Sequence, residues 1–131
     1  MDLSGFKKLE IIAGEPFMSI TDHATAFNQN AVIKLGCPEK VCLLFNYETK
    51  QLAILPSDKD DSKAISFMKP GRDAAKGARF NSKDLQYSLA RQMDWDIDHY
   101  IYRINGTYYE ENNVMVFDLT TAKKSSKRSR K

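Results

Sequence analysis

The segment KVCLLFNYETKQLAILP, residues 40–56, restricts the fold more than any other part of the chain. Residues 41–45 and 52–55 are short apolar runs that favour β-structure, and the polar stretch between them is typical of a turn. Pro56 ends the second run. The segment therefore predicts a β-hairpin. A chain of 131 residues with 42% hydrophobic side chains is long enough to close a single core around it.

Two parts of the chain, about residues 15–56 and 65–119, follow the same order of elements. Each has a short strand, a Phe-Asn pair, a capped helix, a hairpin and an apolar closing strand. Identity between the two parts is low, so a chance similarity remains the alternative. Two interleaved halves would bury strands that neither half could bury alone, and would leave no exposed sheet edge. We therefore predict an α+β, mainly β fold: a small barrel of two β-α-β-hairpin halves with pseudo-two-fold symmetry and two short helices.

Single residues suggest where the elements begin and end. Residues 6–14 and 65–68 predict strands, and Asn28 predicts the N-cap of the first helix. In the second half, Asn81 or Ser82 caps a longer amphipathic helix. The dipeptide Asn105-Gly106 predicts a tight turn.

Residues 25–56 resemble the AbrB/SpoVT-like swapped-hairpin domain. In that family a strand is followed by Ile-Pro, a short helix ending in Leu-Gly, and a hairpin that ends near a proline. Here Phe27-Asn28 stands in place of Ile-Pro, and Leu35-Gly36 and Pro56 match the other two positions. The whole chain is also similar to small uncharacterised proteins of mobile elements and phages of Gram-positive bacteria.

The resemblance implies two interlocked units, related to double-psi barrels, whose assembled face binds DNA. A chain that holds both units would be a single-chain version of the family's homodimer. It departs from the family in two respects. The segment SITDHATAFN carries Asp22 and no basic residue where family members present arginines, and the arginine usual in the following helix is missing. The following helix offers only Lys34. The fold is therefore expected even if DNA binding has been lost or has moved to another face.

Positive charge is concentrated at the end of the chain. Six of the 20 Lys and Arg residues lie in the last nine positions, and the 14 others stand against 17 acidic residues, a net charge of −3 for residues 1–122. We expect residues 1–122 to form the globular domain and residues 123–131 to be a disordered basic tail. The tail could bind nucleic acid nonspecifically through counterion release, or it could be a solubilising end.

Together these patterns predict a non-catalytic, DNA-binding, regulator-like module for transcription. The residues expected to contact DNA are basic and come from the first helix, the second half and the tail: Lys34, Arg72, Lys76, Arg79, Lys83, Lys123, Lys124, Lys127, Arg128 and Arg130.

The alternative prediction is a mobile-element or phage inhibitor that binds a host protein or a small nucleotide-like ligand. Aromatic side chains interleaved with cations can stack on bases, although a barrel also needs such side chains for packing. The residues expected at this second site lie close together in the sequence: Tyr100, Tyr102, Arg103, Tyr108 and Tyr109.

No pattern predicts catalysis, a cofactor or a metal site. His23 and His99 have no nucleophile in a known order around them. Asp94, Asp96 and Asp98 alternate as in a calcium loop, but the required Gly and Glu are missing from their positions. With no apolar stretch of about 18 residues, we expect a cytoplasmic protein without membrane contact. It could be a monomer or a homodimer.

Overall fold

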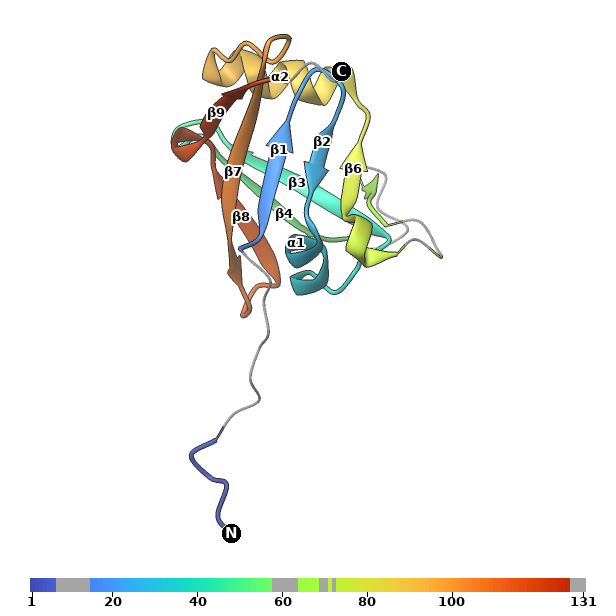
Figure 1. Ribbon diagram of the computed structural model, residues 1–131, viewed down its shortest axis with the longest axis vertical. Helices are drawn as coiled ribbons and strands as arrows, with labels where there is room; N and C mark the ends of the chain where they lie inside the picture. Colours follow the sequence, from blue (N-terminus) through green and yellow to red (C-terminus); the bar gives the residue numbers. More distant parts are fainter. Residues whose placement is uncertain (7–14, 58–63, 69–70, 72, 128–131) are drawn as a thin grey trace.

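One curled antiparallel sheet forms most of the molecule in the computed structural model, which describes residues 1–6, 15–57, 64–68, 71 and 73–127 (Figure 1). The fold is α+β and mainly β, as predicted. The described strands are β1 Phe17–Ile20, β2 Thr25–Phe27, β3 Lys40–Asn46, β4 Gln51–Pro56, β5 Ile65–Ser66, β6 Ala78–Phe80, β7 Tyr100–Tyr109, β8 Val114–Asp118 and β9 Lys123–Ser126.

The strand order is β5-β3-β4-β8-β7-β1-β2-β6, with β9 paired to β7 outside this path. The sheet bends at β7, whose first half pairs with β1 and β9 and whose second half pairs with β8. As a result β1, β2 and β6 lie in front of β3 and β4 in Figure 1, and the core fills the space between them. The predicted hairpin is confirmed as β3 and β4, which pair from Val41–Pro56 to Asn46–Gln51.

The predicted turn at Asn105-Gly106 is wrong, because both residues lie inside β7. A Cβ atom on Gly106 would come within 2.7 Å of a ring carbon of Phe117 and 2.9 Å of the sulfur of Met115. Both of these side chains are fully buried. The glycine is therefore needed for close packing inside the bent sheet, which the dipeptide signal cannot distinguish from a turn.

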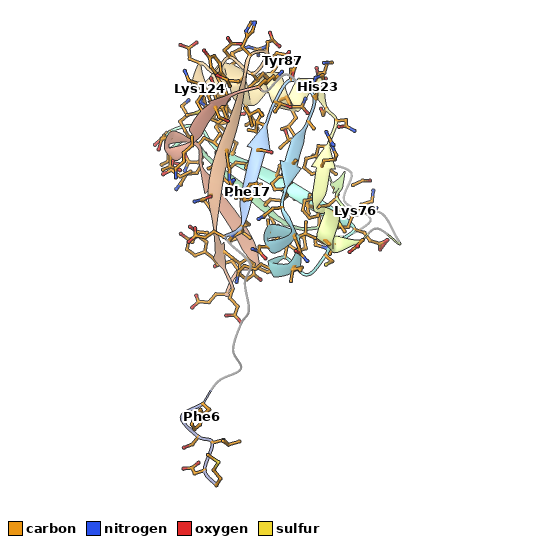
Figure 2. The ribbon with its side chains drawn as sticks, viewed as in Figure 1. Phe6, Phe17, His23, Lys76, Tyr87 and Lys124 are labelled. Atoms are coloured by element: carbon orange, nitrogen blue, oxygen red, sulfur yellow. The ribbon has the colours of Figure 1, made fainter. Side chains whose placement is uncertain are left out.

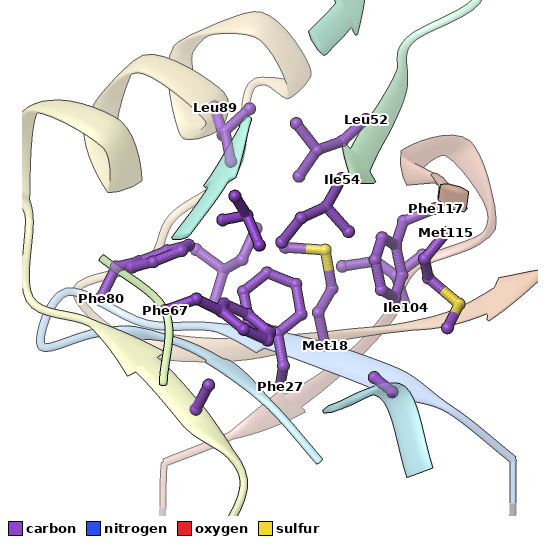
Figure 3. Close-up of a cluster of buried hydrophobic side chains, with 14 of the residues drawn as sticks. Met18, Phe27, Leu52, Ile54, Phe67, Phe80, Leu89, Ile104, Met115 and Phe117 are labelled. Carbon is purple, nitrogen blue, oxygen red and sulfur yellow. The ribbon is translucent and has the colours of Figure 1, made fainter. Parts of the chain in front are cut away.

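The core is built from side chains on alternate positions of the strands, as the two-residue period of a strand requires (Figure 3). Met18, Ile54 and Ile104 are fully buried. The two phenylalanines of the Phe-Asn pairs meet there, since the ring centroids of Phe27 and Phe80 lie 5.7 Å apart in an edge-to-face arrangement.

Within the described residues, two helices and two 3-10 turns connect the strands: α1 Gln29–Lys34, α2 Lys83–Met93, η1 Ala74–Lys76 and η2 Leu119–Thr121. The Asn28 side chain accepts a hydrogen bond from the backbone N–H of Ala31, which confirms the predicted N-cap. For α2 the cap is Ser82, whose hydroxyl accepts from the N–H of Leu85 at 3.2 Å. Figure 1 shows α2 lying across one end of the sheet.

The expected disordered tail is wrong for residues 123–126, which form β9 along the edge of β7. The side chains of β9 stay exposed, so the strand gains backbone hydrogen bonds without removing lysine charge from water. Residues 128–131 lie outside the described residues, as does most of the strand predicted at 6–14. The strand predicted at 65–68 is shorter, since β5 ends at Ser66.

Candidate nucleic-acid interface

A solvent-facing row of side chains crosses the strands β6, β2, β1, β7 and β9. The pairing registers place Arg79 beside Ala26, Ala26 beside Ser19, Ser19 beside Arg103, and Arg103 beside Lys123. On β1, β2, β6 and β7 the residues on either side of the row member, such as Met18, Ile20, Tyr102 and Ile104, are buried in the core. The row residues therefore point to the opposite, outer side of the sheet. We call this outer surface the basic face.

The described strands of the basic face carry positive charge. Its two arginines and Lys123 are exposed, and Ser19 and Ala26 between them are small. None of the residues in the five described strands of this face is acidic. The mildly acidic average of residues 1–122 is therefore not spread evenly, and this part of the sheet has a local excess of cations.

Arg103 has an aromatic partner on the same face. Its guanidinium carbon lies 3.6 Å from the centroid of the Phe17 ring. Phe17 pairs with Asn105 in the sheet, one position along the outer side from Arg103. A cation stacked this closely over an aromatic ring is held in place without a carboxylate to neutralise it.

The other cations predicted to contact DNA are dispersed. Lys34 and Lys76 lie in α1 and η1, near the end of the molecule opposite Lys124, as Figure 2 shows for Lys76 and Lys124. Lys83 begins α2 and donates to the backbone oxygen of Asp22 at 3.4 Å. Of the predicted set, Arg79 and Lys123 lie in the row of the basic face. Arg72, Arg128 and Arg130 lie outside the described residues.

The five residues of the predicted second site do not form one surface. Tyr102 is only 6% exposed and stacks on Trp95, with ring centroids 4.4 Å apart, so it packs the core and cannot reach a ligand. Tyr100 and Tyr108 lie on the same side of β7 as Tyr102. Arg103 and Tyr109 are exposed on the other side. Each partly buried tyrosine has a local partner: the ammonium of Lys124 over Tyr100 at 4.5 Å, and the Asn113 amide oxygen, which accepts from Tyr108 at 2.6 Å.

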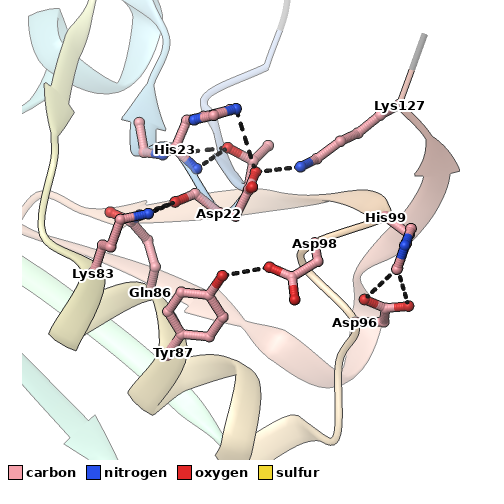
Figure 4. A network of polar contacts seen from close by, with 11 residues as sticks. Asp22, His23, Lys83, Gln86, Tyr87, Asp96, Asp98, His99 and Lys127 are labelled. Carbon is pink, nitrogen blue, oxygen red and sulfur yellow. Dashed lines mark hydrogen bonds and ion pairs between the residues drawn. The ribbon is translucent and has the colours of Figure 1, made fainter. Parts of the chain in front are cut away.

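A polar network at the α2 end of the sheet fixes the position of the β1–β2 loop and the end of β9 (Figure 4). The backbone oxygen of Asp22 accepts from the side chains of Gln86 and Lys83. The Asp22 carboxylate forms an ion pair with Lys127, and the backbone N–H of Lys127 donates to the carbonyl of His99 at 3.3 Å. Lys127 therefore anchors the described end of the chain and is not available as a phosphate contact.

Two pKa values shift in this network. The hydrogen bond from the Lys127 ammonium is the largest cause that lowers the pKa of Asp22 below 3.8. The hydrogen bond that Tyr87 donates to the Asp98 carboxylate raises the pKa of Tyr87 to about 12. Both shifts follow from pairwise contacts at the surface, and neither prepares a general acid or base that acts near neutral pH.

The network does not assemble a metal site. His99 Nδ1 lies 3.0 Å from a carboxylate oxygen of Asp96, and His23 lies 3.7 Å from Asp22. Within the described part of the chain, no group of three or more His, Cys, Asp and Glu residues could hold a metal ion. Cys37 and Cys42 are free thiols.

A second surface, which we call the apolar face, covers the outer side of β3, β4 and β8. Its central row is Leu44, Ala53, Val116 and Thr107, in register across four strands. Leu44 is 53% exposed and Tyr47, in the following turn, is 64% exposed. An open hollow of about 570 Å³ lies over these residues. The basic face and the apolar face lie on opposite sides of the core.

Sequence reasoning placed Arg103 with the tyrosines and did not place it with Arg79 and Lys123. The period of two along residues 100–109 could have separated Arg103 from Tyr100 and Tyr102. It could not have placed Arg103 beside Ser19 and Lys123, because this neighbourhood depends on the pairing of strands that are far apart in the chain.

Comparison of the chain with models of protein families, with curated proteins and with solved structures found no significant match. None of the described helices is long and apolar enough to cross a lipid bilayer.

Proposed function

We propose that this chain is a non-catalytic, cytoplasmic, regulator-like module that binds DNA through the basic face. The observation that carries the proposal is the row Arg79–Ala26–Ser19–Arg103–Lys123, in which cations are in register across neighbouring strands with no acidic residue on those strands. Nucleic-acid affinity depends mainly on cations that replace counterions at the phosphates. A surface with this charge pattern supplies such cations.

The small residues in the middle of the row bear on specificity. Ala26 and Ser19 offer at most one short polar side chain, whereas the strongest discrimination between bases in the major groove comes from long, bidentate side chains. No helix or hairpin rises from the centre of this face in Figure 1. The proposed contacts are therefore with the DNA backbone, and the expected sequence specificity is weak.

The proposal is tested by measuring the affinity for a labelled oligonucleotide over a range of salt concentrations. Arg79→Gln, Arg103→Gln and Lys123→Gln should each reduce the slope of log K against log salt by up to about one unit. Arg91→Gln is the matched control, because Arg91 is an exposed arginine on α2, outside the basic face.

Equal slopes for Arg79→Gln, Arg103→Gln and Arg91→Gln would contradict the proposal. A chain that ends at Lys127 should retain the contribution of the basic face. If removing residues 128–131 alone abolished binding, the charge of the last residues and not the sheet would be the DNA contact.

We also propose that the fold is an internal duplication of an AbrB-like unit with pseudo-two-fold symmetry. Exchanging β1 with β5, β3 with β7, and β4 with β8 turns the order β5-β3-β4-β8-β7-β1 into its reverse, so the same neighbours remain paired. The same exchange swaps β2 with β6, which pair with each other.

The pairing registers support the duplication as well. The exchange turns the pair Asn46–Gln51 of one hairpin into Tyr109–Val114 of the other, and the pair Phe45–Leu52 into Tyr108–Met115. The turns of the two hairpins also match, because Lys50 and Asn113 each precede the closing strand with a positive φ, 59° and 48°.

A second candidate function is the mobile-element or phage inhibitor that binds a host protein. The apolar face favours it, because contiguous exposed apolar residues mark protein interaction sites. Leu44→Lys should abolish the capture of a specific host protein, and Ile33→Lys should not. Ile33 is a suitable control since it is 51% exposed on α1, away from this face. Equal loss of binding with both variants would count against the apolar face.

A further inference from the structure

The Arg103 side chain offers a flat surface to solvent. Its guanidinium carbon lies 3.6 Å from the Phe17 ring centroid, so one side of this planar group faces the ring. Arg103 is exposed and Phe17 is partly buried, so the other side of the guanidinium is accessible. Guanidinium planes are among the groups on which unpaired nucleic-acid bases stack.

We infer that Arg103 on Phe17 is a base-stacking platform, and that the nucleic acid bound by the basic face is a single strand. This inference rests on the proposed function and specifies the form of nucleic acid. One base would stack on the guanidinium of Arg103. Phosphates along the same strand would contact Lys123 on one side of this base and Arg79 on the other.

The spacing of the row is suited to a single strand that crosses the sheet. Lys123 is on the strand next to Arg103, about 5 Å away along the sheet, since neighbouring strands lie about 4.8 Å apart. Arg79 lies beyond β1 and β2, about 14 Å from Arg103 by the same spacing. The small side chains of Ser19 and Ala26 leave the surface between the two arginines low enough for a strand to pass.

A duplex would not use the platform. Its base faces are covered by their neighbours in the stack, and only base edges and backbones reach a protein surface. A guanidinium bound to a phosphate uses the N–H groups at its edge, and its exposed flat side makes no contact with that phosphate. A planar guanidinium fixed on an aromatic ring therefore favours a ligand with exposed base faces.

The inference is tested by fluorescence anisotropy with three labelled probes: a single strand of about 12 nucleotides, within the usual site sizes, a duplex of the same sequence, and an abasic strand of the same length. We expect the full chain to bind the single strand more tightly than the duplex or the abasic strand. Stacking of one base predicts that the abasic strand binds about 5- to 150-fold more weakly.

Arg103→Lys keeps the charge and removes the plane, so it should eliminate most of the difference between the base-bearing and abasic strands. Arg79→Lys, the same change in the same row, should leave that difference in place. Phe17→Leu should act like Arg103→Lys but less strongly, because the guanidinium would lose its support. Thermal melting of each variant checks that the fold is retained.

The outcomes separate this inference from the proposed function. Two results would overturn the platform while leaving phosphate binding in place. One is that Arg103→Lys and Arg79→Lys have the same ratio of affinity for the base-bearing strand to affinity for the abasic strand. The other is that the unaltered chain binds these two strands equally tightly. Tighter binding of the duplex would likewise overturn the single-strand inference alone. Absence of binding to all three probes would overturn both.

Discussion

At the scale of single residues, Asn28 does more than cap a helix. Its side-chain oxygen accepts from the N–H of Ala31 and also from the N–H of Phe17, at 3.1 and 3.0 Å. Its side-chain amide donates to the carbonyl of Glu15 at 3.0 Å. The residue therefore fastens the start of β1 to the start of α1. The sequence indicated the cap, but the contacts with β1 depend on tertiary structure.

Asn28→Ala should lower the free energy of unfolding by about 2 kcal/mol, at the upper end of the range for N-caps, since further hydrogen bonds are lost with the cap. Ser82→Ala should cost about 1 kcal/mol. Asn81→Ala is the control and should have little effect, because the exposed Asn81 is not the cap of α2. Urea denaturation measures all three, and an equal cost for Asn81→Ala and Ser82→Ala would contradict the assignment.

At the scale of secondary-structure elements, the strand β9 could not be predicted from the sequence. The hairpin β3–β4 and both helix caps were predictable because each depends on residues close together in the chain. A short polar segment such as KKSS becomes a strand only because β7 offers it an unpaired edge. The length of β7 depends on tertiary contacts as well. The strand continues through Gly106 because this position packs against Phe117 and Met115, which are distant from its neighbours in the sequence.

The pair Arg103–Lys123 should cost stability, because like charges directly opposite each other on neighbouring strands repel. We expect Lys123→Glu to stabilise the fold by about 0.5 kcal/mol at low salt, within the range of cross-strand pairs, and to weaken DNA binding. Lys123→Gln should give a smaller gain. Thermal melting at low and high salt measures the effect, and a gain that persists at high salt would show that charge is not its cause.

Docking of β9 should depend on pH through Asp22. The lowered pKa of Asp22 means that its ion pair with Lys127 contributes stability above about pH 4, where the carboxylate is ionised in folded and unfolded chains alike. This contribution is lost as the pH falls through the folded-state pKa. Hydrogen-exchange protection factors of residues 123–126 should therefore decrease between pH 6 and pH 3.

Lys127→Gln should give low protection of β9 at both pH values, because the ion pair is absent throughout. Lys124→Gln is the matched control and should retain the pH dependence of the unaltered chain. If Lys127→Gln also retained it, another group would have to anchor the strand.

At the scale of the whole molecule, the two halves depend on each other for their sheet partners. β1 pairs with β7, β2 with β6, and β4 with β8, so each of these pairings joins a strand of the first half to one of the second. The coarse fold class was predictable because hairpins and Phe-Asn pairs recur along the chain. The division into a basic and an apolar face was not, since it depends on which strands become neighbours.

Two fragments, residues 1–60 and 61–131, should therefore each be largely unfolded alone and should form the complete fold when expressed together. Circular dichroism and size-exclusion chromatography of the separate and mixed fragments measure this. A stable fold of either fragment alone would contradict interleaving of the halves.

The pair Ala26–Arg79 has a consequence under the proposed duplication. In an assembly of two identical chains, a residue at this position of the pairing would lie opposite its own copy, so an arginine there would face an arginine. Joining the halves in one chain lets one strand keep the cation while its counterpart becomes a small residue. The same freedom is used at Ala53–Val116 on the other side of the core. In a single chain, a residue at such a position need not be compatible with an identical residue opposite it. One surface could therefore become cationic without placing two like charges face to face.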